Sequence, residues 1–323
     1  MTMPIPINPP RNNQRQRGAA IIILVLILML GLITLFTFRM DRKGPELAAE
    51  RKTALALAQA KEALLGNSML NGLSSGTNQN PGKLICPDID NLSVDQGKPP
   101  SPPLSGNDCR GASPAAKNIG RIPWNSLERG DLYDGNGDRL WYALAPSFVD
   151  AGIINTTLLG DPSRKLIKVT IGATTINDIA AIIVSPGPPL AGQNRSGIND
   201  NLYQNYLENY DPVSLGIVLE SKSSTYNDRV LMISASEVLA FAAQRAVGAL
   251  FKNYLSPPPS AITDLPPEPD IWDKNEWGTA VTSYIQNAAA KSAQINFANC
   301  GMVVSIRWNA ISGRNEVTRS GNC

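Results

Sequence analysis

The sequence contains no histidine among its 323 residues. This absence excludes Ser-His and Cys-His nucleophile pairs, a histidine general base, histidine-ligated zinc and an imidazole pH switch. A G-x-S-x-G pattern at residues 72–76 matches the hydrolase elbow, but Ser74 has neither a preceding strand nor a histidine to activate it. The glycine motifs that bind phosphates and dinucleotides are also missing. We therefore expect a protein that is not an enzyme and that binds no organic cofactor.

The chain also lacks an excess of charge of one sign, since 29 Lys and Arg are balanced by 27 Asp and Glu. Proteins that bind nucleic acid neutralise phosphates with clustered positive side chains. Nothing in the composition predicts such a surface, so we expect no nucleic-acid partner. Apolar residues make up 43% of the chain, which is enough to bury one large core or two modest ones.

The four cysteines contain no C-x-x-C pair and fall into two local pairs, Cys86 with Cys109 and Cys300 with Cys323. Four thiolates could bind zinc, but structural zinc sites usually place two ligands within a few residues of each other. We therefore expect disulfides within the two local pairs, although four cysteines permit three connectivities. Disulfides indicate an oxidising compartment such as a periplasm or a cell surface.

Residues 19–38 form an uncharged apolar run that, as a helix, would extend about 30 Å, the thickness of a bilayer core. A cleaved secretory signal has a shorter apolar run of about 7 to 15 residues followed by small residues, whereas this run ends in Phe38 and Arg39. Basic residues flank both ends equally, so only the disulfides place the bulk of the chain outside the cytoplasm. We expect a membrane-spanning helix with a cytoplasmic N-terminus.

A second helix is expected over residues 45–65, which are rich in Ala, Leu, Glu, Lys and Gln. Leu47, Ala54, Ala58 and Leu65 fall near one line of a helical projection and predict the face that packs on a globular head. We expect this segment to continue the apolar run as one long helix over residues 19–66. The alternative is a separate stalk or signalling helix above a membrane anchor.

The residues before the apolar run carry a sharper pattern. The polar, basic residues 14–17 end at Gly18, which directly precedes the first apolar residue, Ala19. This arrangement resembles the cleavage signal of type IV prepilins and type II secretion pseudopilins. The resemblance implies that a prepilin peptidase cuts between Gly18 and Ala19 and that the new N-terminus is methylated. That family commonly has a glutamate where this chain has Ile23, which favours a minor subunit over a major one.

The globular region reads as a mixture of strands and helices. Strands are expected at residues 166–171, 179–184, 215–219 and 229–233, helices at 236–255, the first capped by Ser236, and at 277–295, and a hairpin at 301–309 and 315–319. Gly137 and Tyr142 match a glycine-to-tyrosine motif of pseudopilins, which implies a strand whose aromatic side chains bury against the long helix. The predicted fold class is α+β: a long N-terminal membrane-spanning helix followed by a mixed head with an antiparallel sheet, stapled by two disulfides.

The expected domains follow from these elements. They are a cytoplasmic leader at residues 1–18, a transmembrane and extended helix at 19–66, an extracytoplasmic α+β domain at 67–256, a Pro-rich linker at 257–269 and a C-terminal subdomain at 270–323.

One candidate metal site lies in the sequence D-G-N-G-D. Asp134, Asn136 and Asp138 supply oxygen atoms at the first, third and fifth positions of a loop resembling an EF-hand, and Asp131 could add another. The twelfth position, which holds a bidentate carboxylate in such loops, is Ala145. Because the same residues are typical of an ordinary solvated turn, calcium binding and a plain turn both remain open.

The resemblance implies a minor type IV pilin or pseudopilin-like subunit that joins or caps a pilus or secretion pseudopilus. Its expected partners are the inner membrane, the prepilin peptidase and other pilin or pseudopilin subunits. The expected location is the bacterial inner membrane, with one pass, a cytoplasmic N-terminus and a periplasmic C-terminal domain, or the cell surface within a filament. The alternatives are a membrane-anchored periplasmic binding or adhesion module outside any filament, and an anchored hydrolase with Ser-Lys or carboxylate chemistry.

Overall fold

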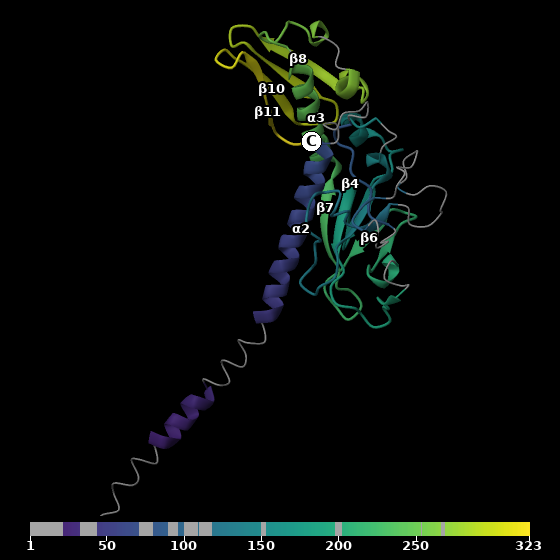
Figure 1. Ribbon diagram of the computed structural model, residues 1–323, viewed down its shortest axis with the longest axis vertical. Helices are drawn as coiled ribbons and strands as arrows, with labels where there is room; N and C mark the ends of the chain where they lie inside the picture. The colour runs from purple at the N-terminus through teal and green to yellow at the C-terminus, as the bar shows by residue number, and fades with distance from the viewer. Residues whose placement is uncertain are drawn as a thin grey trace, which may run out of the picture. The chain divides into compact units, whose positions relative to one another are not determined.

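The computed structural model describes residues 22–32, 44–70, 80–89, 96–99, 109, 118–149, 153–197, 202–252, 254–265 and 269–323 (Figure 1). The chain divides into two units, Met1–Arg51 and Lys52–Cys323. A helical segment at residues 22–32 lies in the first unit, and helix α2 (Gly44–Leu70) begins there and continues into the second. All the strands belong to the second unit.

The expected long membrane-spanning helix over residues 19–66 is wrong. The described residues hold helical segments at 22–32 and 44–70, and no helix in the described ranges is both long enough and apolar enough to cross a membrane. Helix α2 carries charged residues along its length, including Glu50, Lys52 and Lys61. The rest of the fold class, an α+β head rich in sheet with two disulfides, is confirmed.

The larger sheet contains seven strands. Six follow the order β1 (Ile119–Arg121), β2 (Trp141–Leu144), β4 (Thr174–Ser185), β3 (Ile167–Ile171), β6 (Gly216–Leu219) and β5 (Tyr210–Asp211), and β7 (Arg229–Ser234) also pairs with β4. All pairs are antiparallel except β3 with β6, so the predicted antiparallel sheet is mixed at this one pair. Residues 179–185 of β4 are all buried because the strand pairs with β2 and β7 there and is covered on both faces. The predicted strands at 166–171, 179–184, 215–219 and 229–233 are confirmed.

Short turns of 3-10 or π helix connect these strands and the later elements. They are η1 (Pro146–Phe148), η2 (Thr156–Gly160), η4 (Tyr203–Asn205), η5 (Ile262–Asp264) and η6 (Pro269–Asp273).

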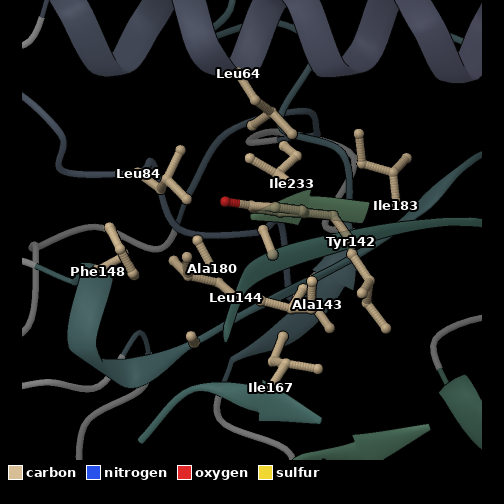
Figure 2. Packing of buried hydrophobic residues seen from close by; sticks show 14 of the residues in the cluster. Leu64, Leu84, Tyr142, Ala143, Leu144, Phe148, Ile167, Ala180, Ile183 and Ile233 are labelled. Atoms are coloured by element: carbon tan, nitrogen blue, oxygen red, sulfur yellow. The ribbon is translucent and has the colours of Figure 1, made fainter. Parts of the chain in front are cut away.

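Helix α2 packs on the larger sheet through a stripe of small residues. Its buried residues recur every three or four positions: Thr53, Ala56, Leu57, Ala60, Ala63, Leu64 and Ser68. Figure 2 shows Leu64 pointing from the helix toward Tyr142, with Ile183 and Ile233 beside it. The prediction that Tyr142 buries against the helix is thus confirmed, but the predicted face is wrong, since Ala54 and Ala58 are exposed. The predicted face and the packed face each carry two leucines, so apolar spacing alone did not distinguish them.

Lys61 on α2 covers the outer edge of β7. Its Nζ donates to the backbone carbonyl of Met232 at 3.1 Å and forms an ion pair with Glu237 at 2.7 Å. Among the described strands, β7 pairs only with β4, so its other edge has no neighbouring strand. The bond from Lys61 therefore supplies a donor to a backbone carbonyl on that edge. Glu237 also marks the start of α3 (Ala235–Lys252), where its backbone N–H donates to Ser234 Oγ at 3.1 Å. The helix is therefore capped by Ser234 and not by Ser236.

The smaller sheet has four antiparallel strands in the order β11 (Arg314–Ser320), β10 (Val303–Asn309), β9 (Ser292–Phe297) and β8 (Val281–Asn287). One face packs on α3, where the guanidinium of Arg319 lies 3.9 Å from the ring centre of Phe241. The expected C-terminal hairpin is confirmed. The expected helix over 277–295 is wrong: α4 (Trp277–Ala280) ends after one turn, because the β-branched and aromatic residues that follow pair as strands.

The Pro-rich segment expected as a linker is held against the smaller sheet. Asn315 Nδ2 donates to the carbonyls of Tyr254 and Ser256, both at 2.9 Å. From the other edge, Tyr284 Oη donates to Pro259 at 2.9 Å and Gln286 Nε2 donates to Pro258 at 3.1 Å. These side chains supply donors to carbonyls that no backbone N–H satisfies among the printed contacts of the described residues. The proposed domain boundaries nevertheless remain predictions.

We expect replacement of Leu64 by Ala to lower the free energy of unfolding by about 2–5 kcal/mol, because the side chain is fully buried against Tyr142. Leu55 on the same helix is 59% exposed, so Leu55→Ala is a matched control that should change it by less than about 0.5 kcal/mol. Urea unfolding of the full chain measures both. Equal effects would contradict the packing described here.

Candidate functional site

The predicted processing residues, Gly18 and Ala19, lie outside the described residues. The predicted disulfides are present, and they join Cys86 to Cys109 and Cys300 to Cys323. The four cysteines are therefore all paired. The second disulfide ties the loop between β9 and β10 to the last residue of the chain, so it closes the end of the smaller sheet.

The candidate calcium loop is organised around a buried carboxylate. Asp134 Oδ1 accepts the backbone N–H groups of Asn136 at 2.8 Å and Asp138 at 3.0 Å, and Oδ2 accepts the hydroxyl of Ser185 at 2.8 Å. The backbone N–H of Gly135 donates to Thr53 Oγ1 on α2 at 2.9 Å. Asp134 thus stabilises the turn through its backbone N–H groups and binds the turn to Ser185 at the end of β4. The turn also contacts α2 through Thr53.

The other two predicted ligands point elsewhere. Asn136 is exposed, and Asp138 Oδ2 pairs with Arg195 Nη1 at 2.7 Å. Within the described ranges no group of three or more His, Cys, Asp or Glu side chains is placed to hold a metal ion. Calcium binding by Asp134, Asn136 and Asp138 therefore stays a prediction, and these contacts support the plain turn.

Arg195 is the centre of a buried polar cluster that the sequence did not reveal. Its side chain is only 7% exposed and, besides Asp138, it donates to the carbonyls of Gly187 at 2.7 Å and Asn205 at 2.9 Å. It also donates to Gln193 Oε1 at 2.6 Å. Burial raises the pKa of Asp138, and the nearby Arg195 guanidinium offsets part of that rise. Arg195 therefore fixes two loops and the candidate calcium turn to one another.

The Arg195 guanidinium also lies over an aromatic ring, with its Cζ 4.6 Å from the ring centre of Tyr206. Arg121 lies 4.2 Å from the centre of the same ring and 4.1 Å from that of Trp141. Cations over aromatic faces are attracted by the ring quadrupole, more strongly where water is excluded. Tyr206 is 2% exposed, so these contacts stabilise the segment between η4 and β5 against β1 and β2.

A second part of the cluster is a pair of carboxyl groups, Glu208 and Asp228. The backbone N–H of Glu208 donates to Asp228 Oδ2 at 2.8 Å, and the backbone N–H of Asp228 donates to Glu208 Oε2 at 3.1 Å. These reciprocal bonds hold the two side chains together. Gln193 Nε2 donates to Glu208 Oε1 at 2.6 Å and thereby connects the pair to Arg195.

The pKa of Asp228 is raised to about 9. Burial is the main cause, and the neighbouring charge of Glu208 contributes to the rise. Among the described residues no Lys or Arg forms an ion pair with either carboxyl group. A proton on Asp228 removes the repulsion and lets its carboxyl donate to Glu208.

The cluster joins residues from four separate stretches of chain, which explains why the sequence did not reveal it. No spacing rule connects Asp138 with Arg195, Glu208 and Asp228, and only Asp138 belongs to a motif that the sequence singled out. The pairing of β4 with β7 and the contacts of residues 186–197 and 202–210 bring them together.

No family model matches the chain, and neither a curated protein nor a solved structure is similar to it. The resemblance to prepilins therefore rests on the residues quoted from the sequence.

The carboxyl pair predicts that stability falls as pH rises. The pKa of Asp228 is about 9 in the folded chain against 3.8 ordinarily, so the folded state keeps a proton that the unfolded state has released. The free energy of unfolding should therefore decrease between about pH 4 and pH 9, by up to about 1.4 kcal/mol per pH unit. Asp228→Asn, which binds no proton, should flatten this slope in urea unfolding.

The matched control is Asp211→Asn. Asp211 is exposed and its pKa is lowered by the hydroxyl and backbone of residues 213–214, so it titrates below this range. It should leave the slope unchanged, and equal slopes in all three proteins would refute a shared proton at Asp228.

Proposed function

We propose that this chain is a minor type IV pilin or pseudopilin-like subunit that works by assembly and not by catalysis. The observation that carries the proposal is the one-sided burial of α2. One face of the helix packs on the larger sheet, while Leu47 and Leu55 are 51% and 59% exposed on the other. A helix that packs one face on a sheet and exposes leucines on the other is suited to pack against helices of neighbouring subunits.

The two disulfides support a location outside the cytoplasm, where thiols are oxidised. A head stapled in this way suits a subunit exposed in a pilus or secretion pseudopilus. The sequence pattern at Gly18 and Ala19 supports processing by a prepilin peptidase before assembly. The absence of histidine fits a role without acid–base chemistry.

The processing step can be tested with Gly18→Glu in cells that contain a prepilin peptidase. The parent chain should be shortened and begin with a methylated Ala19, whereas the variant should keep the precursor length because the residue before the cut is changed. N-terminal sequencing and gel mobility measure this. Gly66→Ala is a suitable control, since a Cβ at Gly66 would meet no atom within 4 Å. Normal processing of the Gly18 variant would refute the proposal.

The assembly surface can be tested with Leu55→Arg. A charge on the exposed face of α2 should reduce recovery of the chain from sheared filaments at least about tenfold, since a buried, unpaired charge is costly in a helix interface. The urea unfolding midpoint should stay near that of the parent. A processed chain that is never recovered from sheared filaments would instead favour a binding or adhesion module outside any filament.

A further inference from the structure

The edges of the two sheets are protected in different ways, with one exception. In the larger sheet, β1 is bridged at Arg121 by the backbone of Asp88, β7 is covered by Lys61, and β5 is only two residues long. In the smaller sheet, β11 carries Arg314, Glu316 and Arg319 along its length. Charges, short strands and covering side chains are the usual ways to prevent an edge from pairing with another chain.

The exception is β8 (Val281–Asn287), the other edge of the smaller sheet. It pairs with β9 on one side, and within the described residues no strand or backbone hydrogen bond covers its outer side. Its sequence, Val-Thr-Ser-Tyr-Ile-Gln-Asn, contains no charge, proline or glycine. Segments of six or seven residues with this composition and an open edge pair readily with another strand.

The register of the smaller sheet shows which backbone groups face outward. The backbone N–H of Trp308 donates to the carbonyl of Lys291, so Lys291 faces β10 and alternate residues of β9 face β8. Ser292 and Gln294 therefore direct their backbone groups toward Asn287 and Ile285. Between these, the N–H and C=O groups of Tyr284 and Gln286 are directed away from β9, toward the open edge.

Ile285 lies between these two residues, and its side chain is on the opposite face of the sheet. The side chains of Tyr284 and Gln286 reach the carbonyls of Pro259 and Pro258 on the packed face. Ile285 is 57% exposed on the other face, where its partners Gln294 and Ser305 are polar. It is thus an apolar side chain at the centre of an edge strand, and the residues beside it on the same face, Gln294 and Ser305, are polar.

We propose that β8 pairs antiparallel with β8 of a second copy of this chain, about a two-fold axis at Ile285. Tyr284 of each copy then exchanges backbone hydrogen bonds with Gln286 of the other. The two Ile285 side chains form the non-hydrogen-bonded pair at the axis, where side chains approach most closely. No charge opposes its counterpart across the axis, since the strand carries none.

This contact goes beyond the proposed filament role, because it uses the smaller sheet and not α2. A stable interface buries about 800 Å² on each partner, which is more than one seven-residue edge provides. The dimer is therefore concentration-dependent and is favoured where copies are held close together.

The test compares two variants of the full chain by sedimentation velocity, in mild detergent because of the apolar run at residues 19–38. Ile285→Lys should raise the dimer dissociation constant at least about tenfold, since two like charges would meet at the axis. Ile311→Lys is the matched control: Ile311 is 100% exposed at the β10–β11 turn of the same sheet, away from β8, and should change the constant less than about twofold.

Cross-linking tests the register. The Cα atoms of a non-hydrogen-bonded pair lie about 4.5 Å apart, which a disulfide can span. Ile285→Cys should therefore form a covalent dimer with diamide, whereas Ile311→Cys should not. A parent chain that stays monomeric to about millimolar concentration would overturn self-pairing in favour of a strand from another protein. Equal cross-linking at both positions would overturn it as well, and neither result affects recovery from filaments.

Discussion

The contact between α2 and the larger sheet is the constraint on which most of this head depends. Small side chains on one face of the helix let it lie close enough for Leu64 to reach Tyr142 and for Lys61 to reach the carbonyl of Met232. The helix thereby closes the core and the β7 edge together. Thr53 extends the same face to the turn at Asp134, so the helix, the sheet and that turn form one connected unit.

Long connections around the larger sheet are organised by polar groups and not by apolar contacts. Arg195 donates hydrogen bonds to carbonyls of two loops and to Gln193. Gln193 in turn donates to Glu208, which connects Arg195 to the pair of carboxyl groups. A buried charge is costly unless it is fully bonded, so this network orders the loops only while each member is in place. Burial raises the pKa of Asp228, which makes the stability of this region depend on pH.

Two surfaces of the described head remain available for other chains, and they differ in chemistry. The outer face of α2 offers leucines to a helix, whereas the β8 edge offers backbone groups and Ile285 to a strand. The first is exposed because the larger sheet packs on the other face of α2, and the second because, among the described strands, β8 pairs only with β9. An assembling subunit needs surfaces of this kind, and neither requires an activated side chain.

Local patterns in the sequence predicted the central strand at residues 179–184 and the C-terminal hairpin, and they favoured the two local disulfide pairs over the other connectivities. The strand with Tyr142 was implied by the resemblance to pseudopilins. The sequence was misleading where local propensity was ambiguous: residues 281–287 became a strand through pairing with β9, and α2 buried the face with Leu57 and Leu64 and not the predicted one. The expected membrane-spanning helix was wrong as well. The Arg195 cluster and the open β8 edge were decided only by tertiary structure, because they depend on residues distant in sequence and on which strand finds no neighbour.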